Sequence, residues 1–215
     1  MTKVLVIGQD EVVELSSDHE SHSPPTNSVA VLLAAGAGSR FLGSEHKLLT
    51  PLPHADGKNI FQASLQHVLE AGFATVIVVT GAAEIPANTL AHRNIVVVHN
   101  NRWVDGQSSS VLLGIREAQR LKASAVVVGL ADQPFVTAEA WRRVAHAPTP
   151  IAVATYSGRN GNPVRLHQSV WELLPKSGDS GARDLIRLRP ELVSQVDCPG
   201  SAADIDTQED LAQWT

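Results

Sequence analysis

The chain has 215 residues, of which 43% are hydrophobic and 18% are charged, a balance that suits one α/β domain, alone or with an appendage. Its 22 acidic and 17 basic residues give a formal net charge of −5 without any lysine or arginine run, which argues against nucleic-acid binding. The single cysteine, Cys198, excludes an intramolecular disulfide and favours a cytoplasmic location, and no apolar run approaches the roughly 18 residues of a membrane span.

Residues 1–28 are predicted to form an N-terminal extension ahead of one domain at residues 29–215. Residues 3–8 are apolar and have the pattern of a short strand or an unpaired tag. Residues 16–28 are polar and contain two prolines, a composition that is typical of a mobile linker.

Within the predicted domain, strand-like and helix-like segments alternate. Continuous apolar runs rich in β-branched residues predict strands at residues 29–35, 75–80, 94–99, 125–130, 151–156 and 192–196. Helical spacing and capping residues predict helices at residues 59–72, 108–121, 137–146, 166–174, 182–188 and 207–214. Because such strands are apolar on both faces, the pattern indicates a three-layer, mostly parallel sheet. Ligands bind at the carboxyl ends of the strands in such sheets, so residues directly after strands are the candidates for a site.

A loop with two glycines follows the first predicted strand. Glycines permit backbone conformations that aim successive N–H groups at an anion. The side chains of Arg40 and Lys47 can bring positive charge to phosphate oxygens. A tight strand-to-helix turn is the alternative explanation. The loop residues are Leu33, Ala34, Ala35, Gly36, Ala37, Gly38, Ser39 and Arg40.

Two common phosphate-binding motifs do not fit this loop. The dinucleotide-binding fingerprint needs a third glycine where this chain has Phe41. It also needs an acidic residue at the end of a second strand about 20 residues later, whereas the next predicted strand begins only at Thr75. The Walker motif needs a lysine where this chain has Ser44. These mismatches count against an NAD(P)-binding oxidoreductase.

Two aspartates are candidates for holding a metal ion. Asp132 follows the predicted strand 125–130, so in a parallel sheet it lies at the same edge as the glycine loop. A carboxylate there can hold Mg²⁺, which takes one or two carboxylates together with phosphate oxygens, or it can cap the turn before Pro134. Asp206 is a candidate second ligand, but Asp206 or Thr207 could equally cap the last helix, and the residues alone favour the cap.

Further polar and glycine-rich segments lie beside the predicted strands and helices. Ser108 and Ser109 open a helix and offer donors to an anion or a base, and Gly81 follows the second strand, where a base can lie. Two later segments are rich in turn residues, and an ordinary turn is the alternative for each. They contain Gly161, Asn162 and Pro163, and then Asp179, Gly181 and Arg183.

Taken together and in this order, these segments resemble the MobA-like nucleotidyltransferase family over about residues 29–215. Within that family the chain is most similar to the molybdenum cofactor cytidylyltransferase (MocA-like) branch. Residues 41–47 and 51–58 depart from the family pattern, because both segments are longer than usual. The matching motifs are residues 33–40, Lys47-Leu48-Leu49, residues 103–106 with 108–114, Ala131-Asp132-Gln133-Pro134, residues 161–164, residues 178–183 and residues 204–207.

The resemblance implies a three-layer, Rossmann-like α/β sheet of the nucleotide-diphospho-sugar transferase type. It also implies Mg²⁺-dependent transfer of CMP from CTP to a phosphorylated pterin acceptor, such as molybdopterin, with release of pyrophosphate. Mn²⁺ is an alternative metal. The sequence Ala34-Ala35-Gly36 favours CTP, because guanylyl enzymes of the family carry Leu-Ala-Gly-Gly there.

The resemblance also distributes roles among the candidate residues. It implies that Arg40, Lys47 and Asp132 are catalytic. It also implies that Asp132 and Asp206 are the metal ligands. The nucleotide would bind to residues 33–39, Gly81, Ser108 and Ser109, and the acceptor to Gly161, Asn162, Pro163, Asp179, Gly181 and Arg183. The expected partners are an NTP, the acceptor, and a molybdoenzyme or its chaperone, but neither nucleic acid nor a membrane. The alternatives are GTP or another donor, a phospho-lactate-type or sugar-phosphate acceptor, an inactive nucleotide- or cofactor-binding module, and the NAD(P) oxidoreductase.

Overall fold

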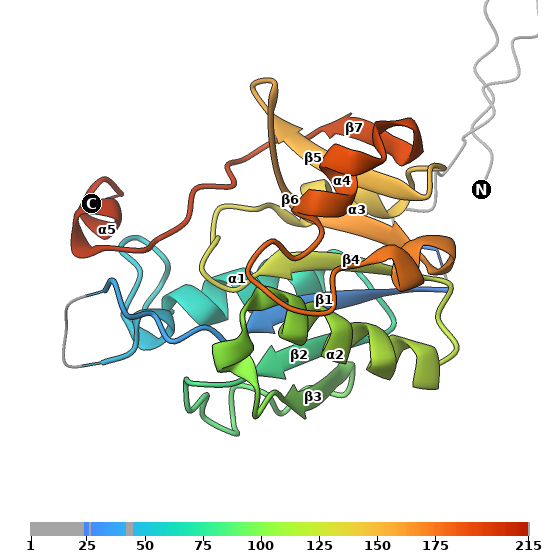
Figure 1. The fold of residues 1–215 in the computed structure, drawn as a ribbon. Coiled ribbons are helices and arrows are strands. Elements are labelled where there is room, and N and C mark those ends of the chain that lie inside the picture. Colours follow the sequence, from blue (N-terminus) through green and yellow to red (C-terminus); the bar gives the residue numbers. More distant parts are fainter. Residues whose placement is uncertain (1–23, 26, 42–44, 215) are drawn as a thin grey trace, which may run out of the picture.

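The computed structural model of the chain describes residues 24–25, 27–41 and 45–214 (Figure 1). The apolar segment 3–8 and most of the predicted linker 16–28 lie outside the described residues. No helix in the described part is long and apolar enough to cross a membrane.

The described residues form one seven-stranded sheet with the strand order β3-β2-β1-β4-β6-β5-β7 (Figure 1). Its parallel pairs are β1 with β2 and β4, β2 with β3, and β5 with β7, while β6 runs antiparallel between β4 and β5. The sheet is therefore mixed and mostly parallel, which confirms the predicted fold class. The strands are β1 (Ser28–Ala34), β2 (Val76–Thr80), β3 (Ile95–His99), β4 (Ala125–Leu130), β5 (Ile151–Tyr156), β6 (Arg159–His167) and β7 (Val193–Asp197).

Helices cover both faces of the sheet and enclose two cores. Alternate residues of β1 point to opposite faces, so Leu32 packs in the core under α1 and α3, and Val31 packs in the core under α2 and α4 (Figure 1). The α-helices are α1 (Ile60–Glu70), α2 (Gln107–Arg120), α3 (Ala138–Ala145), α4 (Arg183–Leu188) and α5 (Gln208–Ala212). The 3-10 helices are η1 (Lys47–Leu49), η2 (Trp103–Asp105), η3 (Gln168–Leu173) and η4 (Pro190–Leu192).

The strand β6 was not predicted, and the helix predicted at residues 166–174 is wrong in part. Leu166 and His167 pair with β4 as the last residues of β6, and only Gln168–Leu173 is helical, as the 3-10 helix η3. The first residues of β6 are exposed and include glycine and proline, which are depleted in strands. Pro163 is tolerated because the register shifts opposite Val153 and Ala154, a bulge that leaves residues 162–163 out of the ladder.

Candidate functional site

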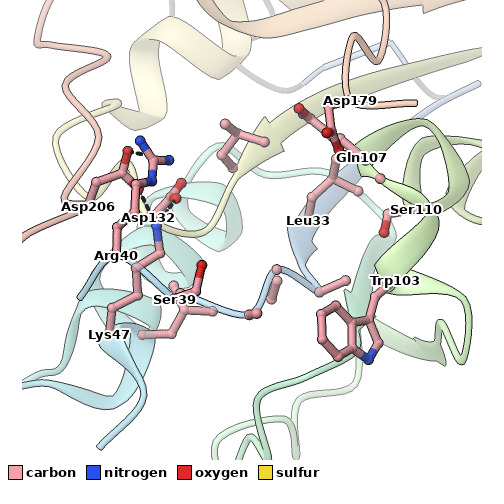
Figure 2. Close-up of a pocket in the computed structure, with 18 of the residues that line it drawn as sticks. Leu33, Ser39, Arg40, Lys47, Trp103, Gln107, Ser110, Asp132, Asp179 and Asp206 are labelled. Atoms are coloured by element: carbon pink, nitrogen blue, oxygen red, sulfur yellow. Dashed lines mark hydrogen bonds and ion pairs between the residues drawn. The ribbon is translucent and has the colours of Figure 1, made fainter. Parts of the chain in front are cut away.

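A cavity of about 470 Å³ opens at the carboxyl edge of the parallel strands. The glycine loop that follows β1 crosses its floor, as predicted from its position after a buried strand. Figure 2 shows a charged cluster on one side of this loop and the beginning of α2, with η2, on the other. The predicted site residues that line the cavity are Leu33, Ala34, Ala35, Gly36, Ala37, Gly38, Ser39, Arg40, Lys47, Asp132, Asp179 and Asp206.

The charged cluster is centred on the ammonium group of Lys47. Lys47 Nζ lies 2.6 Å from Asp132 Oδ2 and 2.6 Å from Asp206 Oδ1, and donates a hydrogen bond to each carboxylate. Arg40 Nη2 approaches Asp206 Oδ2 at 2.8 Å, but the Arg40 side chain is 75% exposed, whereas Lys47 is 8% exposed (Figure 2). Burial by itself lowers the pKa of Lys47, but the charges and hydrogen bonds of Asp132 and Asp206 outweigh it and hold the pKa above its ordinary value. Lys47 is therefore a buried cation at neutral pH.

The glycine loop and η1 are joined by His46. His46 Nδ1 accepts a hydrogen bond from the backbone N–H of Leu48 at 3.2 Å, which caps η1. Since Nδ1 is an acceptor, the proton of the neutral ring is on Nε2, which lies 2.9 Å from the carbonyl oxygen of Gly36 and donates to it. Gly38 has a φ of +63°, and a Cβ there would lie 3.1 Å from Lys47 Cγ and 3.2 Å from His46 Nε2. His46 therefore fixes the loop against the helix that carries Lys47, a role that the sequence analysis missed.

The second aspartate reaches the cluster because Thr207 caps α5. The Thr207 side chain accepts from the N–H of Asp210, and the Asp210 carboxylate accepts in return from the N–H groups of Asp206 and Thr207. The Asp206 side chain is therefore free of the cap and turns toward Lys47. Ile205 is fully buried and its N–H donates to the carbonyl oxygen of Asp132, which anchors the segment before Asp206 beside β4. Thr207 is therefore the helix cap, and Asp206 remains a candidate metal ligand.

A buried amide connects this segment to β6. Gln133 Nε2 donates to Asp204 Oδ1 at 2.8 Å and to the carbonyl oxygen of Ala202 at 3.0 Å. Gln133 Oε1 accepts from Asn162 Nδ2 at 3.1 Å. Burial, and then the charge of Asp132, raise the pKa of Asp204 above its ordinary value. Asn162 therefore contributes to the packing of the segment before Asp206.

The donor set of the cluster suits a hard divalent cation. Asp132 and Asp206 present carboxylate oxygens to a single point, and a cationic group already lies at that point. No group of three or more histidine, cysteine or acidic side chains with metal-binding geometry occurs among the described residues. The two aspartates therefore fit a Mg²⁺ or Mn²⁺ ion that takes its remaining ligands from phosphate and water.

Three residues predicted to bind the nucleotide lie outside the cavity wall. Gly81 packs under the loop, where a Cβ would lie 2.6 Å from the carbonyl oxygen of Ala35. Ser108 is buried, and Ser109 Oγ donates to backbone carbonyl oxygens of residues 102 and 106. The wall is formed instead by Gln107 and Ser110, together with Trp103 and Val104 of η2. Helical spacing could have identified Gln107 and Ser110 together, because residues three apart share a face of α2.

The residues predicted to bind the acceptor do not all line the same pocket. Asn162 and Arg183 line a second, smaller pocket of about 50 Å³, and Gln107 borders both this pocket and the larger cavity. The Asp179 carboxylate lies in the larger cavity and accepts from the N–H of Gln107 at 3.3 Å, at the beginning of α2. Gly161, Pro163 and Gly181 line neither pocket, and a Cβ on Gly161 would lie 2.7 Å from the Ala202 side chain.

Comparisons with known proteins place this architecture in a family. The model of the MobA-like NTP transferase domain matches residues 30–196. Nicotine blue oxidoreductase from Paenarthrobacter nicotinovorans is 34% identical over 197 residues, which are 84% of this chain and 93% of the relative. The purine catabolism protein PucB from Bacillus subtilis (strain 168) is 29% identical over 195 residues, which are 85% of this chain and 93% of PucB.

Solved structures agree with the family match. A nucleotidyl transferase from Methanothermobacter thermautotroptrophicus superimposes with a TM-score of 0.74 at 26% identity, over 86% of this chain and 94% of that one. Rv0371c from Mycobacterium tuberculosis H37Rv, in a complex with manganese, gives a TM-score of 0.70 at 26% identity, over 87% and 97% of the two chains. With the glycine loop, the buried lysine and the paired aspartates in one cavity, the chain belongs to the MobA-like NTP transferase domain family and is a nucleotidyltransferase.

Proposed function

We propose that the protein transfers CMP from CTP to a phosphorylated acceptor of the pterin type and releases pyrophosphate. An oxygen of the acceptor phosphate attacks the α-phosphorus of CTP, and the bond between the α-phosphorus and the oxygen that bridges it to the β-phosphorus breaks. The single observation that carries this proposal is the convergence of Lys47, Arg40, Asp132 and Asp206 on one cavity beside the glycine loop. Such a transfer depends mainly on positioning and on neutralising charge, and the cavity offers both.

Each group has a defined role in the proposal. The backbone N–H groups of the glycine loop bind the phosphates, and Lys47 and Arg40 offset the charge that develops on them. Asp132 and Asp206 hold a Mg²⁺ or Mn²⁺ ion, which when bound polarises the phosphate oxygens. The manganese complex of Rv0371c supports a divalent metal in this fold. A phosphate nucleophile is already ionised near neutral pH, so the reaction needs no general base.

The acceptor is proposed to lie between the two pockets. Gln107 borders both, and Arg183 lines the smaller pocket, where its guanidinium can bind an acceptor phosphate. The preference for CTP rests on Ala34-Ala35-Gly36, and the pterin acceptor rests on the resemblance to the molybdenum cofactor branch. The product would then pass to a molybdoenzyme or its chaperone, and the single cysteine favours the cytoplasm.

The test is a panel of the four NTPs, with and without molybdopterin, assayed for pyrophosphate release in Mg²⁺ or Mn²⁺. We expect release with CTP and acceptor together, and its loss in Asp132→Ala, with Glu70→Ala on the surface of α1 as a control that stays active. Faster release with GTP would contradict the choice of CTP. Wild-type turnover by Asp132→Ala would contradict the metal site, and mass spectrometry of the product identifies any other acceptor.

A reduction driven by NAD(P)H is a second candidate activity, because the relative with 34% identity is named nicotine blue oxidoreductase. The loop lacks the dinucleotide fingerprint, and the charged cluster faces the cavity where a triphosphate would need it. Calorimetric titration with NADH and NADPH beside CTP separates the two activities. Binding of a reduced dinucleotide in preference to CTP would favour the oxidoreductase.

A further inference from the structure

The ammonium group of Lys47 lies where a bridging metal ion would have to lie. Its Nζ is 2.6 Å from one oxygen of Asp132 and 2.6 Å from one oxygen of Asp206. A cation that bridges these two oxygens at the point between them must replace Nζ. Lys47 is buried, so solvent screens these two ion pairs less than it screens pairs on the surface.

The charges of the four side chains in the cluster cancel without any added cation, and Asp204 is a neighbouring carboxylate whose pKa is raised by burial and by the charges of Asp132 and Asp206. Two carboxylates face two cationic side chains, because Arg40 contacts the second oxygen of Asp206. A divalent cation that approaches this neutral cluster meets a fixed positive charge. Free metal therefore gains little from the two aspartates as long as Lys47 stays between them.

The glycine loop offers the Lys47 ammonium group a second set of possible partners. Its Cγ packs against Gly38 of the glycine loop, where a Cβ would lie only 3.1 Å away. The loop lines the cavity that would take the triphosphate, and the lysine stem is long and flexible. Phosphate oxygens bound to the loop would therefore compete with the aspartates for the same ammonium group.

We infer that Lys47 is an internal cation that keeps divalent metal away from Asp132 and Asp206 until a triphosphate draws the ammonium group aside. Metal and nucleotide then bind together, and the empty enzyme binds metal weakly. This inference rests on the metal site of the proposed function. It goes beyond that function because it assigns an order of binding.

The experiment measures Mn²⁺ binding by electron paramagnetic resonance, first without nucleotide. Lys47→Met should bind Mn²⁺ on the order of tenfold more tightly than wild type, because the competing charge is removed. Lys58→Met is the matched control, since it removes a surface lysine that pairs only loosely with Asp56 at 3.9 Å, and it should bind Mn²⁺ as wild type does. A CTP analogue that is not cleaved should strengthen Mn²⁺ binding more in wild type than in Lys47→Met. Equal Mn²⁺ affinity of Lys47→Met and wild type without nucleotide would overturn the inference.

Two further measurements keep the outcomes distinct. Lys47→Met leaves two carboxylates without their cation, so its melting temperature should rise more with Mn²⁺ than that of wild type, and Lys47→Gln provides a second variant if the first folds poorly. Asp132→Asn and Asp206→Asn, each combined with Lys47→Met, should lose the added affinity. If they bind Mn²⁺ as tightly as Lys47→Met alone, the proposed metal site itself is wrong. If they lose the affinity and the nucleotide effect is the same in wild type and Lys47→Met, only the order of binding is wrong.

Discussion

The two halves of the sheet build their parts of the site in different ways. In the parallel half, β3-β2-β1-β4, the glycine loop and Asp132, both candidate site residues, follow directly after the buried strands β1 and β4. In the other half, β6-β5-β7, an antiparallel strand begins with exposed residues, and the candidate acceptor residues do not gather in one pocket. The comparison teaches that a strand apolar on both faces can be recognised in the sequence, and with it the cavity-lining residues at its end, whereas a strand with a bulge and exposed first residues cannot.

The halves also differ in charge. The parallel half contributes Asp132 and the glycine loop to a cluster of four charged groups, whereas Arg183 is the one charged side chain that lines the small pocket, within the described residues. We therefore expect substitutions in the charged cluster to affect nucleotide binding and substitutions of Arg183 to affect only the acceptor.

The largest effect is expected from the glycine loop. Gly38→Ala places a side chain at a positive φ and within 3.2 Å of His46 and Lys47, which should cost about 1 to 2 kcal/mol and displace the lysine. We expect pyrophosphate release to fall at least tenfold, as a steady-state assay would show. Gly36→Ala is the matched control, because a Cβ there meets nothing within 4 Å, and its melting temperature should stay near that of wild type. Equal melting temperatures for both variants would contradict the loop geometry.

Arg183→Ala should weaken binding of the acceptor without affecting binding of CTP. Arg183 lines the small pocket and does not line the large cavity, so we expect the KM for the acceptor to rise about tenfold while the KM for CTP stays unchanged. Arg187→Ala removes a surface arginine of the same helix that pairs with Asp184 at 3.1 Å, and should change neither constant. A rise in the KM for CTP in Arg183→Ala would show that the halves are not independent.

Substitutions of His46 should have a smaller effect on nucleotide binding. They can separate its contact with the glycine loop from its cap of η1. His46→Asn keeps an acceptor near Nδ1 for the N–H of Leu48, and His46→Gln keeps a donor that can reach the carbonyl oxygen of Gly36. If the contact with the loop is what matters, the KM for CTP should rise several-fold in the first variant and less in the second. The same pair of substitutions at His67, on α1, should leave the KM unchanged. The reverse order of the two KM values would assign the effect to the helix cap instead.

The thiol of Cys198 should take no part in catalysis. Cys198 is buried, and burial raises the pKa of its thiol to about 11, so at pH 8 only about one thiol in a thousand is ionised. Because the pKa is raised, alkylation by iodoacetamide should be slow at neutral pH and should accelerate about tenfold per pH unit until the pKa is reached. Mass spectrometry follows the reaction, with the unfolded protein as the fast reference. Rapid alkylation of the folded protein at pH 7 would contradict the burial.

The sequence was most informative where burial is complete. The apolar runs before Ala35 and Ala131 predicted strands, and the rule that ligands lie beyond strand ends led to the glycine loop and to Asp132. The family resemblance, confirmed by the match over residues 30–196, supplied the role proposed for Asp206. The residues alone had favoured a helix cap, because a cap and a metal ligand have the same local pattern.

The remaining residues could not be found because their roles depend on partners that are distant in the sequence. Gln133 is important through Asn162 and Asp204, which lie 29 and 71 residues away and are brought together only by the sheet. His46 acts on Gly36 across a segment where the chain departs from the family pattern. Periodicity detects faces of helices and strands, and neither of these contacts follows a period.

The ion pair between Lys47 and Asp206 joins residues that are 159 positions apart. Contacts of such separation slow folding, because closing a long loop costs conformational entropy before the contact can form. During synthesis, the glycine loop and Lys47 therefore emerge long before the aspartate that completes their charge balance. The charged cluster is complete only in a chain that has been made through Asp206, so a product that ends before this residue would lack one carboxylate of the site.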